Sequence, residues 1–265
     1  MRILFVGDVF GQAGRRIVGE HLGQVIEQRA VDLVVVNAEN AAGGFGLTPG
    51  IAEELFDLGA HVITTGNHVW DKREIIEYMR SVRLDSHSRA RRVLRPANYV
   101  AGTPGYGYYE GELPQGQTYA VIDLQGRVFM ASLDDPFRVV DSLLEKIKAK
   151  VIFVDLHAEA TSEKVALGWY LDGRVTAVIG THTHVPTADE RILPGGTAYQ
   201  TDVGMSGPFD SVIGVEKEQI INRFLTGMPG KFEAAKGDPR MCAALIDCDG
   251  ATGRAISIQR LMLAE

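Results

Sequence analysis

Two histidines separated by a single residue, His182 and His184, are the first feature of this sequence that points to chemistry. They follow an apolar run at residues 177–179 that is typical of a buried strand and that stops at Gly180. Imidazole is the commonest nitrogen ligand of zinc, iron and manganese, and side chains at i and i+2 beyond a strand end can turn toward one point. The alternative is that two histidines fell together by chance on a polar loop. Taken alone, the two histidines fit this interpretation and a metal site equally well, so the decision depends on further ligands elsewhere in the chain.

Other apolar runs end in the same kind of polar group. The runs at residues 2–6, 32–36, 61–65 and 151–156 are followed by Asp8, Glu39, Asn40, Asn67, His68 and His157. In α/β sheets, ligands bind beyond the carboxyl ends of the strands, so we expect these side chains to converge. A purely structural sequence would rarely repeat this pattern, and the pattern therefore predicts a metal site.

The combined set of ligands is larger than one metal ion needs. With His182 and His184 it contains two carboxylates, two amides and four imidazoles, which suits two ions joined by a bridging carboxylate, either Glu39 or Asp8. Two ions about 3.5–4 Å apart can hold a hydroxide between them and contact both the attacking and the leaving oxygen of a phosphoryl transfer. The predicted chemistry is hydrolysis of a phosphate ester.

The elements that must position these residues alternate along the chain, which predicts one α/β domain over residues 1–265. Helices are expected at residues 15–29, 48–59, 71–82, 136–150, 163–171 and 216–226. Further strands are expected at residues 174–180, 199–203, 241–248 and 255–263. Residues 119–124 and 127–132 are predicted to form a hairpin, and residues 102–116 a loop that serves as a lid or an oligomer contact.

Composition narrows the function further. The net charge of −7 argues against a long nucleic-acid track. Only Cys242 and Cys248 are present, so a disulfide framework is not expected. No secretory signal and no apolar run of membrane-spanning length is recognised, so we expect a cytoplasmic protein without a membrane contact. The arginine-rich stretch at residues 83–95 is interpreted as a solvated face or partner surface, or else as a rim that steers anions.

The motifs resemble those of the calcineurin-like metallophosphoesterases. Gly66-Asn67-His68 is similar to the third motif of that family, His157 to the fourth, and the segment from Gly180 to His184 to the fifth. The first two motifs depart from the usual pattern, because no histidine follows Asp8 and because Glu39-Asn40 replaces the usual pair of aspartates. These departures, and the segment at residues 201–205, are similar to the bacterial YmdB-like branch of cyclic-nucleotide phosphodiesterases.

The resemblance implies a fold, an activity and a set of roles. The fold would be a sandwich of two mixed β-sheets flanked by helices. One ion would take Asp8, Glu39, Asn40 and His184, and the other Glu39, Asn67, His157 and His182, with His68 as general acid. A metal-bridging hydroxide would attack the phosphorus of a 2′,3′-cyclic nucleotide, and the activity would extend to 3′,5′-cyclic nucleotides. Oxygen and nitrogen ligands without a thiolate favour iron or manganese.

Two other functions remain open from the sequence. One is a phosphomonoesterase or phosphoprotein phosphatase, and the other is a regulator that binds a nucleotide without turning it over. The expected partner is a small phosphodiester; whether the chain forms a homo-oligomer is left open. His61 and His87 have no place in the scheme and are interpreted as structural. Thr183 is expected to pack or hydrogen-bond within its turn, and Asp202 either to orient a ligand histidine or to form a turn.

Overall fold

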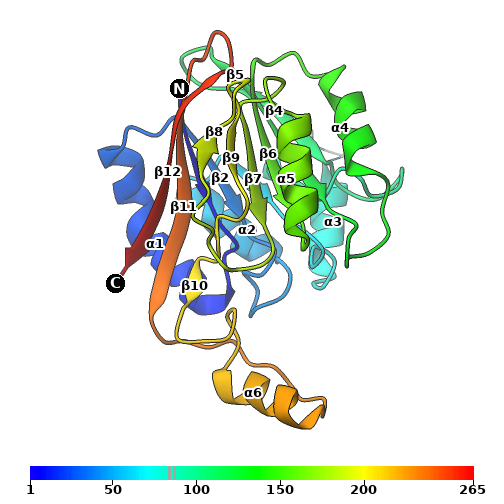
Figure 1. The fold of residues 1–265 in the computed structure, drawn as a ribbon, viewed down its shortest axis with the longest axis vertical. Coiled ribbons are helices and arrows are strands. Elements are labelled where there is room, and N and C mark those ends of the chain that lie inside the picture. Colours follow the sequence, from blue (N-terminus) through cyan, green and yellow to red (C-terminus); the bar gives the residue numbers. More distant parts are fainter. Residues whose placement is uncertain (83–84, 86–87) are drawn as a thin grey trace.

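The computed structural model describes residues 1–82, 85 and 88–265, which form two mixed six-stranded sheets packed face to face (Figure 1). The first sheet has the order β10-β11-β1-β2-β3, with β12 paired to β11. Its strands are β1 (Arg2–Val6), β2 (Leu33–Asn37), β3 (Val62–Thr64), β10 (Gly207–Pro208), β11 (Pro239–Cys248) and β12 (Ala255–Ala264). The predicted sandwich of two mixed sheets is therefore confirmed.

The second sheet has the order β4-β5-β6-β7-β9-β8. Its strands are β4 (Tyr108–Glu112), β5 (Thr118–Gln125), β6 (Val151–His157), β7 (Ala177–Thr181), β8 (Arg191–Ile192) and β9 (Ala198–Gln200). Within the two sheets, β1, β2 and β3 run parallel, as do β5, β6, β7 and β9. Parallel neighbours end at the same edge, so the polar residues that follow them are brought together.

The helices are α1 (Gly11–Gln28), α2 (Pro49–Asp57), α3 (Glu74–Ser81), α4 (Pro136–Leu144), α5 (Thr161–Tyr170) and α6 (Lys217–Thr226), with a short 3₁₀ turn at Arg89–Arg92. Helices α1 to α5 cover the outer faces of the sandwich, and α6 lies beyond one end of it (Figure 1). Local chemistry fixes several starts: Thr48 accepts a hydrogen bond from the Ile51 amide and Pro49 follows it, and Asp135 accepts one from Phe137 ahead of α4. In the part of the chain that the structure describes, no helix has the length and apolar character to cross a membrane.

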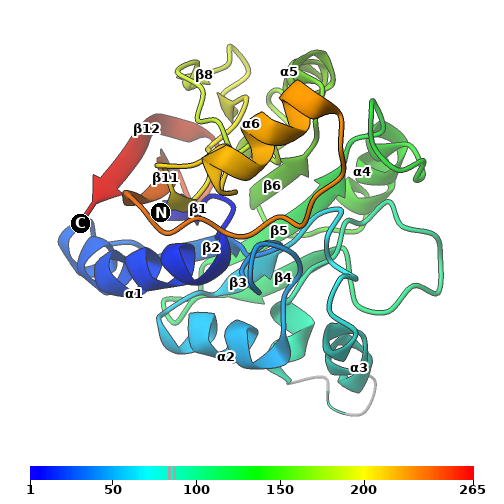
Figure 2. The ribbon, with the colours of Figure 1, turned by 90° about the horizontal axis from the view of Figure 1, so that it is seen from below.

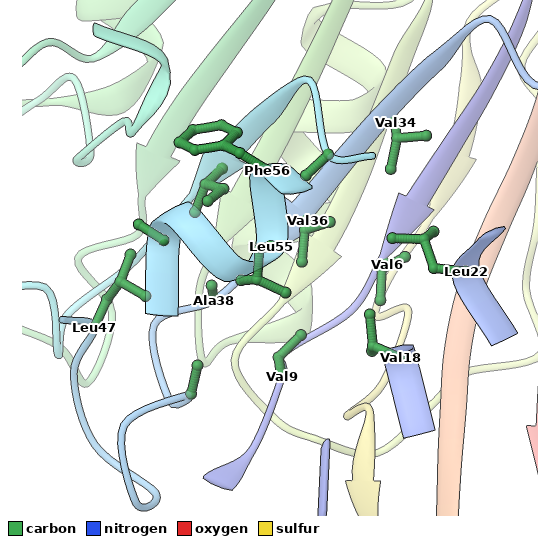
Figure 3. Packing of buried hydrophobic residues seen from close by; sticks show 14 of the residues in the cluster. Val6, Val9, Val18, Leu22, Val34, Val36, Ala38, Leu47, Leu55 and Phe56 are labelled. Atoms are coloured by element: carbon green, nitrogen blue, oxygen red, sulfur yellow. The ribbon is translucent and has the colours of Figure 1, made fainter. Parts of the chain in front are cut away.

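The hydrophobic core lies in three layers. Between the two sheets, buried side chains such as Ile3 and Val35 meet the other sheet, and the rings of Phe5 and Phe153 lie 4.8 Å apart. Valines of β1 and β2 pack against Val18 and Leu22 of α1 and against Leu55 and Phe56 of α2 (Figure 3). A third layer joins the second sheet to α4 and α5. Strands buried on both faces are held rigidly, which gives the residues at their ends fixed positions.

The predicted hairpin, part of the predicted loop and two helix bounds are wrong. Residues 127–132 form no strand; instead β4, in the stretch predicted to be a loop, pairs antiparallel with β5, with Tyr109 opposite Val121. The physical reason is that the other side of β5 is already paired with β6, Val121 being opposite Phe153, so a hairpin partner had no free edge there. Helix α1 also begins at residue 11 rather than 15, and α4 ends at 144 rather than 150.

A buried ion pair ties α5 to the turn after β7. Lys164 and Asp202 have side chains that are each 1% exposed, with 2.7 Å between Nζ and Oδ2. Lys164 also donates to the Thr181 carbonyl, and Asp202 accepts from the amide and hydroxyl of Thr183. Asp202 therefore has the turn role, and Thr183 hydrogen-bonds within the turn as expected. This turn separates His182 from His184, so the ion pair fixes both histidines.

We expect Lys164→Met to lower the free energy of unfolding by about 3–5 kcal/mol, because it leaves the Asp202 carboxylate buried without a counterion. Urea denaturation of the purified protein measures this. The matched control is Lys217→Met, which breaks the exposed pair with Asp210 and should cost less than about 1 kcal/mol. Equal effects of the two substitutions would contradict the role given to Lys164, whereas partial recovery in Lys164→Met/Asp202→Asn would support it.

Candidate metal centre and catalytic site

The predicted site residues meet at one end of the sandwich. Asp8 follows β1, Glu39 and Asn40 follow β2, and Asn67 and His68 follow β3. His157 is the last residue of β6, and His182 and His184 follow β7. Figure 2 looks at this end of the molecule, with α6 lying across it. Both sheets therefore contribute to a single cluster.

One group of side chains surrounds His157. Its Nε2 lies 3.0 Å from Oε1 of Glu39, 3.0 Å from Oδ1 of Asn67 and 3.0 Å from Nδ1 of His182. Glu39, His157 and His182 each offer one ligand atom within 4.8 Å of the others. These residues form a set of oxygen and nitrogen donors that faces a common centre.

A second group lies beside the first and shares Glu39 with it. Asp8, Glu39 and His184 also offer ligand atoms within 4.8 Å of one another. The amide nitrogen of Asn40 lies 3.0 Å from Oε1 of Glu39 and 3.1 Å from Nε2 of His184. Of the two carboxylates that the sequence suggests as bridges, only Glu39 belongs to both groups, whereas Asp8 belongs to one.

Hydrogen bonds fix which ring nitrogens face the centre. Thr181 donates its hydroxyl to Asp155 at 2.7 Å, so it accepts from Nδ1 of His157 at 2.9 Å, and Nε2 is the ring nitrogen that faces the centre. His184 donates from Nδ1 to the carbonyl of Ile213 at 2.8 Å, which likewise directs its Nε2 toward the centre. Such partners are typical of histidines that ligate metals, because they fix the tautomer and the ring orientation.

The pKa shifts in the cluster indicate that its buried carboxylates need a nearby positive charge. Burial raises the pKa of Asp8 well above its usual range. Burial also raises the pKa of Glu39, but the charge and hydrogen bond of His157 outweigh it and bring the pKa to about 2. For His157 burial lowers the pKa, and Glu39 outweighs this to give about 9. The pKa of His182 falls to about 3 through burial and the neighbouring charge of His157. Buried carboxylates in this cluster stay ionised only next to a cation.

The donors present fit metal ions. Among the described residues, Oδ1 of Asp8 and Oδ1 of Asn40 are buried without a hydrogen-bond partner. Adjacent ligands at about 2.1 Å from an octahedral ion lie about 3.0 Å apart, and the donors around His157 have this spacing.

His68 stands apart from both groups. Its backbone amide donates to Oε2 of Glu39 at 3.1 Å, and its Nδ1 lies 2.9 Å from Oδ2 of Asp71. The ring is partly exposed and meets Phe45 edge-on, with 5.0 Å between ring centroids. It lines a cavity of about 560 Å³ together with Glu39, Asn40, His182 and His184. His68 can therefore touch a ligand in the cavity.

Backbone geometry explains two motif glycines and the shape of the last motif. A Cβ on Gly66 would lie 2.3 Å from the His157 ring and 2.5 Å from Oε2 of Glu39, and one on Gly180 would lie 1.8 Å from the Thr201 carbonyl. His182 and His184 adopt positive φ angles of 100° and 66°. Such conformations are costly for non-glycine residues, and the hydrogen bonds from Thr183 to Asp202 hold the turn in place.

Some residues of the site were not identified from the sequence. Oε2 of Glu159 lies 3.2 Å from Nε2 of His182, and Glu159 lines the cavity. Asp155 accepts hydrogen bonds from Asn37, Thr64 and Thr181 and so joins the two sheets beneath the cluster. The sequence signal that could have identified Asp155 is its position as the one carboxylate inside an apolar strand. For Glu159 the signal is weaker, namely its position two residues beyond a histidine at a strand end.

The arginine-rich stretch packs against the body of the protein. Arg89 pairs with Glu53 and Asp57, and the guanidinium groups of Arg91 and Arg92 lie over aromatic rings. Among the arginines of residues 85–95 that the structure describes, none lines the cavity. Arg83 and His87 lie outside the described residues. His61 is structural as predicted, since its Nδ1 accepts from the Val34 amide at 3.1 Å.

Comparison with known proteins identifies relatives that match nearly the whole chain. A family model described as "YmdB-like protein" matches residues 4–261. A 2′,3′-cyclic-nucleotide 2′-phosphodiesterase of Bacillus subtilis is 48% identical over 267 residues, which cover 99% of this chain and 97% of that protein.

Two solved structures are also similar over the whole chain. One is a hypothetical protein of Thermus thermophilus, with a TM-score of 0.92 and 46% identity, covering 100% of both chains. The other is a novel phosphatase of Mycoplasma pneumoniae, with a TM-score of 0.91 and 36% identity, covering 100% of this chain and 93% of that one. Because the family model and these relatives span nearly the full sequence, the chain belongs to the YmdB-like protein family.

Proposed function

We propose that this protein is a metal-dependent phosphodiesterase that opens 2′,3′-cyclic nucleotides. The observation that carries the proposal is the position of Glu39, which belongs to two adjacent groups of ligating side chains, while His68 stands outside both and lines the cavity. The name of the Bacillus subtilis relative supports the substrate class.

The proposed ligand sets follow the two groups. Asp8, Glu39, Asn40 and His184 would hold one ion. The other would be held by Glu39, Asn67, His157 and His182. Ligands of this oxygen and nitrogen chemistry suit iron or manganese. When bound, two such ions polarise the phosphate and supply a hydroxide nucleophile near neutral pH.

The side chains of the chain itself account for the rest of the proposed reaction. Oxygen from water adds to phosphorus, the bond from phosphorus to the 2′ oxygen breaks, and that oxygen takes a proton. His68 would donate this proton from Nε2, because its Nδ1 is occupied by Asp71 at 2.9 Å. The Asp71 carboxylate also fixes the orientation of the ring through this contact.

Charge favours a diester over a monoester. Two divalent ions balanced by Asp8, Glu39 and a hydroxide leave a net charge of about +1, which matches the single negative charge of a phosphodiester. The proposed activity extends to 3′,5′-cyclic nucleotides. Hydrolysis of phosphomonoesters is the alternative, which the Mycoplasma pneumoniae relative described as a phosphatase favours. The net charge of −7 opposes long nucleic acids as substrates.

Glu39→Ala should lose both metal ions, because this side chain belongs to both groups, whereas Asn40→Ala should weaken mainly one. Elemental analysis of the purified variants measures the metal content per chain. Glu112→Ala, which removes an exposed acid from β4, is the control and should keep the wild-type content. Two full equivalents of metal in Glu39→Ala would rule out a bridging Glu39.

His68→Ala should keep its metals and lose on the order of 10²–10⁴-fold in rate, because it removes a proton donor and no ligand. The loss should shrink for esters of 4-nitrophenol, whose leaving group needs no proton. Asp71→Asn should give a smaller loss with the same dependence on the leaving group. Loss of metal from His68→Ala, or an equal deficit for good and poor leaving groups, would contradict the role.

The substrate order is tested by kcat/KM measured with one metal. We expect 2′,3′-cyclic AMP to be hydrolysed fastest, ahead of 3′,5′-cyclic AMP, because the five-membered ring is strained and exposes the phosphorus. Adenosine monophosphates and a short RNA should follow. A monophosphate that is hydrolysed faster than every diester would identify a phosphomonoesterase instead, and tight binding without product would identify a regulator.

A further inference from the structure

The cavity has a second half that the hydrolytic chemistry does not use. Its volume of about 560 Å³ lies within the range of about 300–1,000 Å³ that is usual for small-molecule sites, and one phosphate group fills little of it. Four of the proposed ligands, Glu39, Asn40, His182 and His184, line it together with His68. Much of the remaining lining is an apolar wall that includes Phe45, Val212, Ile213, Ile220, Phe224 and Phe232.

Most of this apolar wall comes from α6 and the segments that flank it. Helix α6 has no buried residue and lies across the site end of the sandwich (Figures 1 and 2). It is nevertheless anchored, because Ile220 and Phe232 pack against the buried cluster of Phe10, Met205 and Val215. The Glu216 amide also donates to the Glu233 carbonyl at 3.0 Å. The wall therefore has a defined position relative to the cluster of ligands.

Two aromatic rings of the wall are open to a ligand. Phe224 is 85% exposed although it lines the cavity, and Phe45 is 37% exposed. Phe45 sits among Gly43, Gly44 and Gly46, all with positive φ, and its ring lies edge-on to His68. An aromatic ring in water at the mouth of a cavity gains free energy when a flat partner covers it.

The wall also carries a donor. Arg223 is the only lysine or arginine among the described residues that line the cavity, and its guanidinium lies 5.0 Å from the centre of the Phe232 ring. Guanidinium groups donate hydrogen bonds and stack on planar rings. A wall of exposed aromatic rings with N–H donors suits a flat group that has acceptor atoms at its edge, rather than an aliphatic chain.

We propose that this wall, formed by α6 and the loop at residues 43–46, binds the nucleobase of the substrate, with Phe224 and Phe45 as its stacking surfaces. The inference rests on the proposed function, since a phosphate at the ligand end places the rest of a nucleotide in the same cavity. Bases of every kind have a flat face, so stacking selects nucleosides over base-free esters without selecting one base.

The test compares a substrate with and without a base. The metal-loaded enzyme is assayed with 2′,3′-cyclic AMP and with 1-O-methylribose 2,3-cyclic phosphate. Phe224→Ala should lower kcat/KM for the nucleotide about 5- to 100-fold, mainly through KM, and leave the base-free ester unchanged. Phe224→Trp, which keeps an aromatic ring, should retain the wild-type preference for the nucleotide over the base-free ester. Leu225→Ala is the matched control, because this neighbour is 80% exposed and belongs to α6 but does not line the cavity.

A binding measurement separates this inference from the proposed function. Calorimetric titration with 3′-AMP should give weaker binding to Phe224→Ala than to the wild type or Leu225→Ala. If cyclic nucleotides are not hydrolysed but this difference is found, the base site stands and the proposed function falls. If Phe224→Ala and Leu225→Ala match the wild type in both KM and binding, or if both substrates lose equally, the inference is overturned.

Discussion

The burial of negative charge at the edge of two sheets is the constraint on which the site depends. Asp8 and Glu39 are almost fully removed from water, and burial alone would drive both to take up protons. The His157 imidazole of the second sheet supplies a neutralising charge and a hydrogen bond to Glu39, and the His68 amide donates a second hydrogen bond. A carboxylate that remains ionised in such a place attracts a cation strongly, because little water is left to screen it. The same burial that is costly for folding thus creates affinity for metal.

The rest of the architecture keeps that cluster from relaxing. Asp155 links Asn37 and Thr64 of one sheet to Thr181 of the other, so the two sheets are joined by hydrogen bonds directly below the ligands. Lys164 and Asp202 fix the turn between the last two histidines. Side chains at the motif glycine positions would collide with the ligands or with a neighbouring segment, so these positions set how closely the strands approach. The metal site is therefore rigid because its supports are buried and mutually bonded.

The apolar wall of the cavity is less buried than the cluster of ligating side chains. The wall on α6 is exposed, lacks buried residues of its own and is anchored through a small cluster around Phe10. Phe10 lies where β1 leads into α1, and its ring also meets His184 edge-on at 5.5 Å. One aromatic side chain thus connects the rigid cluster of ligands to the apolar wall. The cavity lining therefore combines a rigid cluster of ligating side chains with a more exposed apolar wall.

The sequence alone determined which residues end the buried strands, and the resemblance of its motifs to a known family indicated the two-sheet sandwich. The strand ends were predicted because apolar runs and the glycines that stop them are local signals, and parallel strands must end at a common edge. Strand pairing and contacts between distant segments decided the remaining features of the fold and the site. The edge of β5 was available to β4 and closed to residues 127–132, which local propensity could not reveal. The arginines of residues 89–92 found acidic and aromatic partners, and α6 brought residues 212–232 over the ligands. The α6 wall reaches the site only through long-range packing, and no local pattern records which distant segments will share a surface.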